Sequence, residues 1–235
     1  MTNNEFVENE DFREKVGEWV DVLKDLTDKD DIVGLLQDIN YLILDYKIVV
    51  DNDFVIYPIW VEAYYRNEKK GFIDESCHND DNPPRQFKLR EHKNNTNNER
   101  RGGVDLYLSD SKEYYLSFLI KLALIKESNG DLKLCSQSKI KNKLKNHPEV
   151  KNHFKTLDTL KLTFTETDLN TSELRKAKCK RVGLSNNNDD NNNDNNNDDV
   201  VNYNEMKLAA CYDEEKPRNY NVLKRKTGLY VLKKD

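Results

Sequence analysis

The sequence predicts a single α+β domain, in which an N-terminal pair of helices packs on a mostly antiparallel sheet. Apolar residues recur at spacings of three and four through residues 11–45, which is the pattern of amphipathic helices. Strand-like runs bounded by polar turns follow from residue 48 onward. The length of 235 residues suits one domain of good size.

The two N-terminal helices are predicted from their apolar stripes. The first stripe, within residues 11–30, consists of Phe12, Val16, Trp19, Val20, Val22, Leu23 and Leu26. The second consists of Ile32, Leu35, Leu36, Ile39, Leu42 and Ile43, and Asp30 or Asp31 can cap this helix. Because each helix has one apolar face, both must pack on another element, and the sheet that follows is the expected partner.

Four segments predict the strands of the sheet. Residues 48–50 and 54–65 are predicted to form a hairpin around a polar turn at residues 51–53. Residues 104–108 alternate, so that Asp105 and Tyr107 share one face. The apolar run at residues 114–125 favours a buried strand, with a helix as the competing interpretation.

The remaining segments are predicted with less regular patterns. Residues 66–101 are polar and read as a long irregular loop, which in a domain of this size is usually functional or disordered. Residues 131–154 are rich in Lys and amphipathic, and Pro148 divides them. Residues 157–164 and 229–232 resemble strands.

An Asn/Asp-rich tract at residues 186–199 stands apart from the rest of the chain. It lacks the apolar side chains that offset the entropy of ordering, so we expect a disordered insertion. The five aspartates of the tract carry as much charge as the whole formal net charge of −5. The remainder of the chain is therefore close to neutral, with local Lys/Arg clusters at residues 139–155, 175–181 and 216–234 that could meet phosphates or be solvated faces.

The cysteines and the N-terminus bear on compartment and cofactors. Four widely spaced cysteines form no C-x-x-C pair, so a disulfide framework and a zinc site are not indicated. Asp74, Cys77 and His78 lie close together, but no second His or Cys completes a ligand set, and we predict no metal and no cofactor. The first residues do not resemble a signal peptide, and no run is long enough to span a bilayer. We therefore expect a soluble cytoplasmic monomer, associated with the nucleoid if the source is bacterial.

Glu62 is the residue that most needs a functional explanation. It lies in the aromatic and branched run at residues 56–65, and the period of two places it on one face with Tyr64. A Glu and a Tyr at a pocket wall could hold a water and stack a flat substrate, whereas the ordinary alternative is an exposed Glu on a sheet edge. Lys121 is a cation in an apolar run: such a Lys usually extends to the surface, and otherwise faces a carboxylate or a phosphate.

Several of these landmarks, in order along the chain, resemble the methylpurine-DNA glycosylases, also called 3-methyladenine DNA glycosylases. Residues 60–64, Trp-Val-Glu-Ala-Tyr, are similar to the Glu-Ala-Tyr motif of that family, and Asp74 with His78 to its loop pair. Residues 118–123, Phe-Leu-Ile-Lys-Leu-Ala, are similar to its Val-Leu-Ile-Arg-Ala motif. Lys-Arg-Val-Gly-Leu at residues 180–184 and Lys-Pro-Arg-Asn-Tyr at residues 216–220 are similar to its two late motifs.

The resemblance implies a curved antiparallel sheet with flanking helices and a hydrolase that excises alkylated purines from DNA. Glu62 would activate water at the sugar C1′, and Lys121 would hold that water or a neighbouring phosphate. Further implied contacts are Tyr64, His78 and Asp105 to the extruded base, and Arg85, Arg181, Lys216 and Arg218 to the DNA backbone.

The chain differs from the family in one segment that bears on the substrate, and two other functions are alternatives to the glycosylase. No Tyr lies between Arg85 and Val104, where the family carries an aromatic wedge. Because base extrusion normally needs a wedge, a single-stranded or already distorted DNA is the expected partner. One alternative is a nucleic-acid-binding protein of the same fold without the chemistry. The other is an intracellular interaction protein with no role on nucleic acid.

Overall fold

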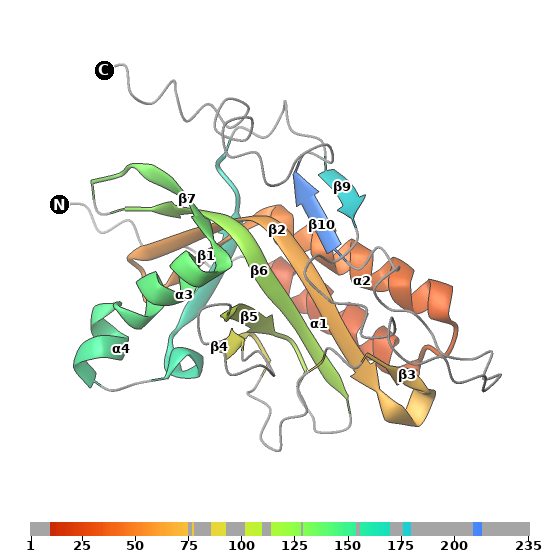
Figure 1. Ribbon diagram of the computed structural model, residues 1–235. Coiled ribbons are helices and arrows are strands. Elements are labelled where there is room, and N and C mark those ends of the chain that lie inside the picture. Colours follow the sequence, from red (N-terminus) through yellow and green to blue (C-terminus); the bar gives the residue numbers. More distant parts are fainter. Residues whose placement is uncertain are drawn as a thin grey trace, which may run out of the picture.

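One antiparallel sheet of ten strands organises the part of the chain that the structure describes (Figure 1). The computed structural model describes residues 10–74, 77, 86–92, 102–109, 114–127, 129–153, 156–169, 176–179 and 209–212. The strands are β1 (Tyr46–Val50), β2 (Phe54–Asn67), β3 (Phe72–Ile73), β4 (Lys88–His92), β5 (Gly103–Tyr107), β6 (Tyr115–Lys126), β7 (Leu132–Ser136), β8 (Leu162–Glu166), β9 (Lys176–Cys179) and β10 (Ala209–Tyr212).

The two longest strands, β2 and β6, form the centre of this sheet. The main strand order is β4-β5-β6-β2-β1-β8, and β6 follows β2 from Val55 to Arg66. The opposite edge of β2 pairs in turn with β1, β10 and β3. The predicted hairpin is confirmed, since β1 and β2 pair around the turn at residues 51–53. The predicted buried strand at residues 114–125 is also confirmed, as β6.

The sheet curls into a half-barrel whose end strands approach each other (Figure 1). Phe87, next to β4, and Phe164 of β8 have ring centroids 5.8 Å apart, although their strands lie at opposite ends of the strand order. Phe12 joins them, stacking on Phe164 at 4.4 Å. Such clusters of aromatic rings contribute area burial and an additional pairwise attraction. The single α+β domain expected from the sequence is therefore present, with one curled sheet.

Helices α1 (Glu10–Asp25) and α2 (Lys29–Leu44) cover one face of the sheet, on its far side in Figure 1. Their apolar stripes are buried as the spacing predicts, including Phe12, Val16, Leu36 and Ile39. The cap of α2 differs from expectation. Asp28 caps it by accepting from the N–H groups of residues 30 and 31, because the helix begins at residue 29, one position before the two candidate aspartates.

The segment expected as one irregular loop, residues 66–101, contains regular structure in its described parts. Strand β2 continues to Asn67 and is followed by a single 3₁₀ turn, η1 (Glu68–Lys70). Gly71, with φ 72°, ends this turn, and β3 then pairs with the end of β2. Strand β4 then pairs with β5 over its whole length. The sequence Lys-Leu-Arg-Glu-His of β4 has one apolar residue, Leu89, so its strand character comes from the partner rather than from its own pattern.

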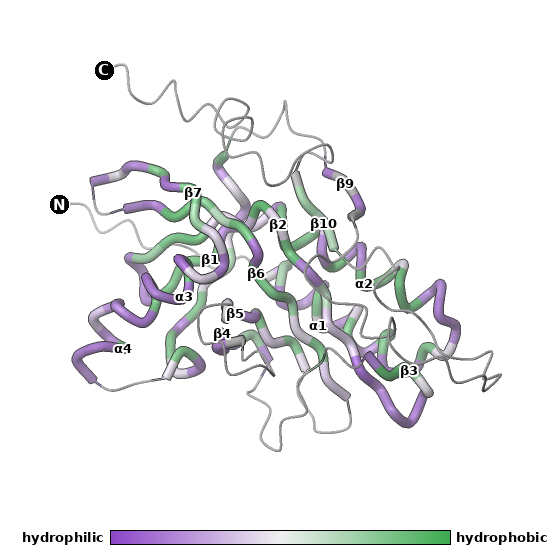
Figure 2. The backbone as a smooth tube through the Cα atoms, in the orientation of Figure 1, coloured by the Kyte–Doolittle hydropathy of each residue, from purple (hydrophilic) through white to green (hydrophobic). Residues whose placement is uncertain are grey.

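The Lys-rich segment at residues 131–154 is only partly helical. Its first residues form β7, which pairs with β6, and helices α3 (Gln137–Lys145) and α4 (Pro148–His153) follow. Pro148 begins α4, where its missing N–H costs nothing. The strand expected at residues 157–164 starts later, because residues 157–159 form the 3₁₀ turn η3 (Leu157–Thr159) and β8 begins at Leu162. Figure 2 shows α4 as predominantly hydrophilic, in contrast to the apolar β2 and β6.

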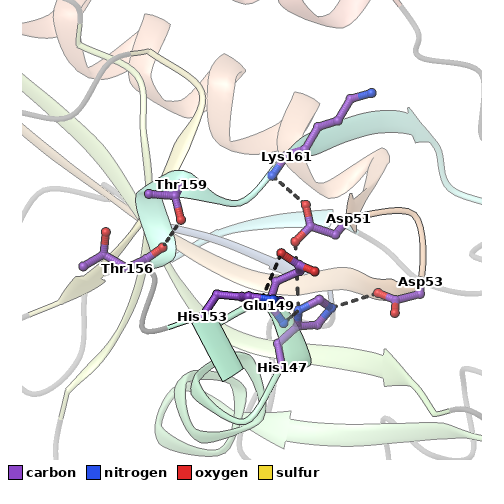
Figure 3. Close-up of polar contacts among 8 residues, drawn as sticks. All are labelled: Asp51, Asp53, His147, Glu149, His153, Thr156, Thr159 and Lys161. Carbon is purple, nitrogen blue, oxygen red and sulfur yellow. Dashed lines mark hydrogen bonds and ion pairs between the residues drawn. The ribbon is translucent and has the colours of Figure 1, made fainter. Parts of the chain in front are cut away.

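The junction between α3 and α4 is anchored to the hairpin turn by His147 (Figure 3). Its Nδ1 accepts from the N–H of Glu149, so its Nε2 donates to Asp53 Oδ1 at 2.8 Å. Asp51 Oδ2 lies 4.0 Å from Nδ1, and Asp51 Oδ1 accepts from the N–H of Lys161. Asp51 and Asn52 have φ of 47° and 67°, as a tight hairpin turn requires. His147, which is 5 % exposed, thus ties the α3–α4 junction to the hairpin turn, and Asp51 ties that turn to Lys161.

Glu91 of β4 is held by two lysines of α3, which gives a testable pH dependence. Burial raises its pKa, but hydrogen bonds and charges from Lys145 and Lys141 outweigh burial, so the pKa lies below its ordinary value of 4.5. A depressed carboxyl pKa stabilises the fold above the unfolded-state pKa, and the effect is lost as pH falls through the folded-state pKa. We expect Glu91→Gln to lower the free energy of unfolding by about 0.5–1 kcal/mol at neutral pH, since solvent screens this half-exposed group.

Urea unfolding at pH 7 and at pH 3 measures this effect. The difference between the wild type and Glu91→Gln should be larger at pH 7 than at pH 3. Glu14→Gln, at an exposed position of α1, is the matched control and should stay within about 0.5 kcal/mol of wild type at both pH values. A constant difference for Glu91→Gln at both pH values would show that the two ion pairs are not its cause.

Two further expectations concern the thiols and the membrane. Among the described side chains, Cys77, Cys135 and Cys211 are buried free thiols. Of the helices in the described ranges, none is long and apolar enough to cross a membrane. The Asn/Asp tract at residues 186–199 and the expected strand at residues 229–232 lie outside the described residues.

Candidate functional site

A buried carboxylate with two side-chain donors lies at the centre of the sheet. Glu62 of β2 is fully buried, and its Oε2 accepts from Lys121 Nζ of β6 at 2.9 Å. The hydroxyl of Tyr64 donates to the same oxygen at 3.2 Å. The prediction that Glu62 and Tyr64 share one face is confirmed. We name this arrangement the Glu62 cluster, consisting of Glu62, Tyr64 and Lys121.

Two ordinary interpretations of these residues are wrong. Glu62 is not exposed on a sheet edge, because β2 is an inner strand with β6 on one side and β10 on the other. Lys121 does not extend to the surface, since its side chain is 19 % exposed and its ammonium pairs with Glu62. The alternative in which Lys121 faces a carboxylate is the one that holds. The remaining exposure of Lys121 marks the side from which solvent reaches the ion pair.

Lys121 lies two positions after Leu119, which is opposite Glu62, so the register of β2 and β6 brings it to the face of Glu62. Two β-bulges next to Trp60 adjoin this contact. Along the β2–β6 pair, Pro58 lies opposite Ala123, Trp60 opposite Leu122, and Val61 opposite Ile120. Ile59 in β2 and Lys121 in β6 are therefore the extra residues of the two strands. A bulge changes the direction of a side chain and often occurs beside a functional site. Each strand gains one residue here, so the pairing recovers on both sides of the bulges.

A second carboxylate lies in the same cross-strand row as Glu62. Asp105 of β5 is opposite Leu119 of β6, and Leu119 is opposite Glu62. Residues directly opposite in an antiparallel pair share a face, so Asp105 and Glu62 lie on one face, on either side of Leu119. Asp105 is 2 % exposed. Arg90 of β4 continues the row beyond Asp105.

Tyr107 and Tyr115 form an aromatic group on this face beside Asp105. Their ring centroids are 5.0 Å apart with an edge-to-face angle of 87°. Burial raises the pKa of Tyr107 to about 12, and burial followed by the charge of Asp105 raises the pKa of Tyr115 well above its usual value. Both phenols therefore stay protonated near neutral pH, and the Ser117 hydroxyl donates to the Tyr115 oxygen at 3.2 Å.

Close packing holds this face against neighbouring segments. A Cβ added at Gly103 would lie 2.7 Å from Leu119 Cδ1 and 3.1 Å from Gln137 Cβ, so any larger residue there would require both side chains to shift. Cys77, after β3, packs against Tyr64 and Leu119. The chain on both sides of the Glu62 cluster is thus fitted closely to the sheet, which fixes the positions of the polar groups.

The site residues predicted from the sequence fall into two groups: those that the structure describes and those that lie outside the described residues. The structure brings Glu62, Tyr64, Lys121 and Asp105 to one face of the sheet. The predicted base contact His78 and the predicted backbone contacts Arg85, Arg181, Lys216 and Arg218 lie outside the described residues. Sequence reasoning did not single out Tyr107, Tyr115 or Trp60 as site residues. The alternation in β5, which places Tyr107 on the face of Asp105, is a signal that could have identified the first of them.

The lysines of α3, expected to contribute to a basic surface, are largely matched by carboxylates. Lys141 and Lys145 pair with Glu91 at 3.3 Å and 2.8 Å. Lys143 pairs with Glu127 at 2.7 Å. Lys141 is also 7 % exposed, which leaves little of it for a partner. This part of the expected basic patch therefore stabilises the domain internally.

Comparisons with known protein families, with curated proteins and with solved structures found no match. No group of three or more His, Cys, Asp or Glu side chains that could hold a metal ion occurs within the described ranges. This face presents two carboxylates, an ammonium and phenols on neighbouring strands. These groups can orient a water molecule, stabilise a developing positive charge and donate hydrogen bonds.

Proposed function

We propose that the protein is a methylpurine-DNA-glycosylase-like hydrolase that cleaves the N-glycosidic bond of an alkylated purine in DNA. The observation that carries the proposal is the convergence of Glu62, Tyr64 and Lys121, three residues of the motif resemblance that come from two strands. Glu62 and Lys121 are in contact at 2.9 Å. The curled antiparallel sheet with flanking helices is compatible with the same proposal.

The proposed reaction suits a carboxylate in this setting. An alkylated purine carries a positive charge and departs as a neutral base, taking the electron pair of the C1′–N bond. Water then supplies the oxygen of the new C1′–O bond and releases one proton, which Glu62 accepts. The sugar becomes positively charged as the bond breaks, and the Glu62 carboxylate stabilises that charge. Lys121 orients the carboxylate through the ion pair and can hold the attacking water.

The proposed DNA contacts use the exposed side of the ion pair and exposed basic residues of the domain. Lys121 is the partly exposed member of the Glu62 cluster, so the extruded nucleotide approaches from its side. Lys139 and Lys151 are exposed and can contact phosphates, together with the basic residues predicted from the late motifs. The partner is single-stranded or distorted DNA, bound by a monomer, because extrusion from an intact duplex normally needs a wedge.

One observation favours the alternative of a nucleic-acid-binding protein without the chemistry. Glu62 is fully buried and already paired with Lys121, an arrangement that can also serve to specify the packing of a core. In that case DNA affinity would remain and base release would not occur. The two functions are thus separated by a single measurement of free base.

We expect the purified protein to release free base from alkylated single-stranded DNA and to leave alkali-labile abasic sites. Glu62→Gln keeps a hydrogen-bond acceptor for Lys121 but cannot accept the proton, so release should fall by about 100-fold or more. Chromatography of the released bases and alkaline cleavage of a labelled strand measure both products. Glu127→Gln, which alters a carboxylate paired with lysines outside the cluster, is the matched control and should retain activity.

The possible outcomes are distinct. Equal release by wild type and Glu62→Gln would exclude Glu62 from the mechanism. Salt-dependent DNA binding without release by the wild type would support the binding protein, because phosphate contacts release counterions. Absence of both release and salt-dependent binding would contradict both nucleic-acid functions and leave an interaction protein.

A further inference from the structure

Trp60 carries a buried hydrogen-bond donor next to the Glu62 cluster. Its side chain is 4 % exposed, and its Nε1 is buried and finds no hydrogen-bond acceptor within the described part of the chain. An indole Nε1–H can only donate. Buried polar groups in folded proteins are nearly always satisfied, so one that is not points to an absent water or ligand.

The position of Trp60 directs this donor to the face of Glu62. Trp60 pairs with Cys211 and Glu62 with Ala209 in one uninterrupted register between β2 and β10. Residues two apart in such a strand point to the same face. Trp60 also lies between the two extra residues of the bulges, Ile59 and Lys121. Trp60 and Lys121 are therefore close to each other in the register of the paired strands β2 and β6.

We propose that the Trp60 indole N–H donates a hydrogen bond to the unalkylated ring nitrogen of the departing purine. This inference rests on the proposed function and names the part of the substrate that the site recognises. The ligand is a purine with a ring-nitrogen acceptor, bound with its glycosidic carbon next to Glu62. Trp60 then stabilises the leaving group, while Glu62 and Lys121 act on the sugar and water.

The charge change of the base explains how this hydrogen bond would accelerate the reaction. Before cleavage the alkylated purine is cationic, and its remaining ring nitrogen is a poor acceptor. As the electron pair of the C1′–N bond moves into the ring, the base becomes neutral and its nitrogen a better acceptor. The hydrogen bond is therefore stronger in the transition state than in the bound substrate, and it raises kcat more than it lowers KM.

A kinetic experiment tests the proposal with 7-methylguanine in single-stranded DNA, whose free ring acceptor is N3. Trp60→Phe keeps an aromatic ring and removes the donor, so kcat should fall about tenfold with KM changed less than about twofold. Trp19→Phe, at the other Trp of the chain, is the matched control and should change neither. A 3-deaza substrate lacks the acceptor, so the wild type should cleave it with a kcat that is lower by the same factor. Trp60→Phe should not lower the kcat on this substrate any further.

An NMR experiment separates failure of this inference from failure of the proposed function. The two indole N–H signals are assigned with the same two variants, and free 7-methylguanine or its 3-deaza analogue is added to the wild-type protein. A shift of the Trp60 signal with the first base alone supports the inference, even if wild type releases no base and the proposed hydrolysis fails. An unmoved Trp60 signal, or an equal loss of kcat on both substrates, overturns it.

Discussion

Replacing Lys121 by Met is expected to lower the free energy of unfolding by about 3–5 kcal/mol, because the change leaves a buried charge without its ammonium partner. Glu62 has no exposed surface, so its carboxylate cannot recover hydration by a small movement. Tyr64 still donates to it at 3.2 Å, but one phenol does not replace an ammonium. Urea unfolding followed by circular dichroism measures the loss.

Two further variants, Glu62→Gln and the double variant Glu62→Gln/Lys121→Met, show whether the broken ion pair causes the loss of stability in Lys121→Met. Glu62→Gln should cost less, because Lys121 is 19 % exposed and can keep water around its ammonium. The variant with both changes should recover most of the stability lost by Lys121→Met, since no unpaired charge remains buried. Lys143→Met removes a half-exposed lysine from a carboxylate in the same domain and should cost at most about 1 kcal/mol. A double variant as unstable as Lys121→Met would contradict this account.

Replacing Phe12 by Ala is expected to cost about 3–5 kcal/mol, the usual loss for removing a large buried aromatic ring. Phe12 is 1 % exposed. Its ring centroid lies 4.4 Å from that of Phe164 and 4.6 Å from that of Tyr46. The ring joins α1 to strands near both ends of the curled sheet, where Phe87 also approaches at 6.1 Å. Its removal opens a cavity that several rings would have to fill.

Val22→Ala tests whether this loss depends on the buried face of α1. Val22 is in the same helix but is 52 % exposed, so its truncation should change the free energy of unfolding by about 0.5 kcal/mol or less. Guanidinium chloride midpoints of both variants, with m-values compared to wild type, give the measurement. Similar midpoints for the two variants would show that the aromatic cluster does not hold α1 to the sheet.

Local periodicity allowed much of the fold to be predicted. In α1, α2, β2 and β6, the spacing of the apolar residues within each segment is enough to predict the helix or strand. Strand β4 was missed because its pattern is polar and its pairing with β5 decides its structure. The strand β7 at the start of the Lys-rich segment was not predicted either, and it is a strand through its pairing with β6.

The sequence by itself determined that Glu62 and Tyr64 share a face, because that follows from the period of two within one strand. It did not determine the partner of Glu62. Lys121 is 59 positions away along the chain, and it reaches the face of Glu62 only through the register in which β2 and β6 pair. The row that brings Asp105 to the same face, and the burial of the Trp60 N–H, likewise depend on contacts between distant strands. Tertiary structure decided these features, because strand register is a property of pairs of segments and not of either segment alone.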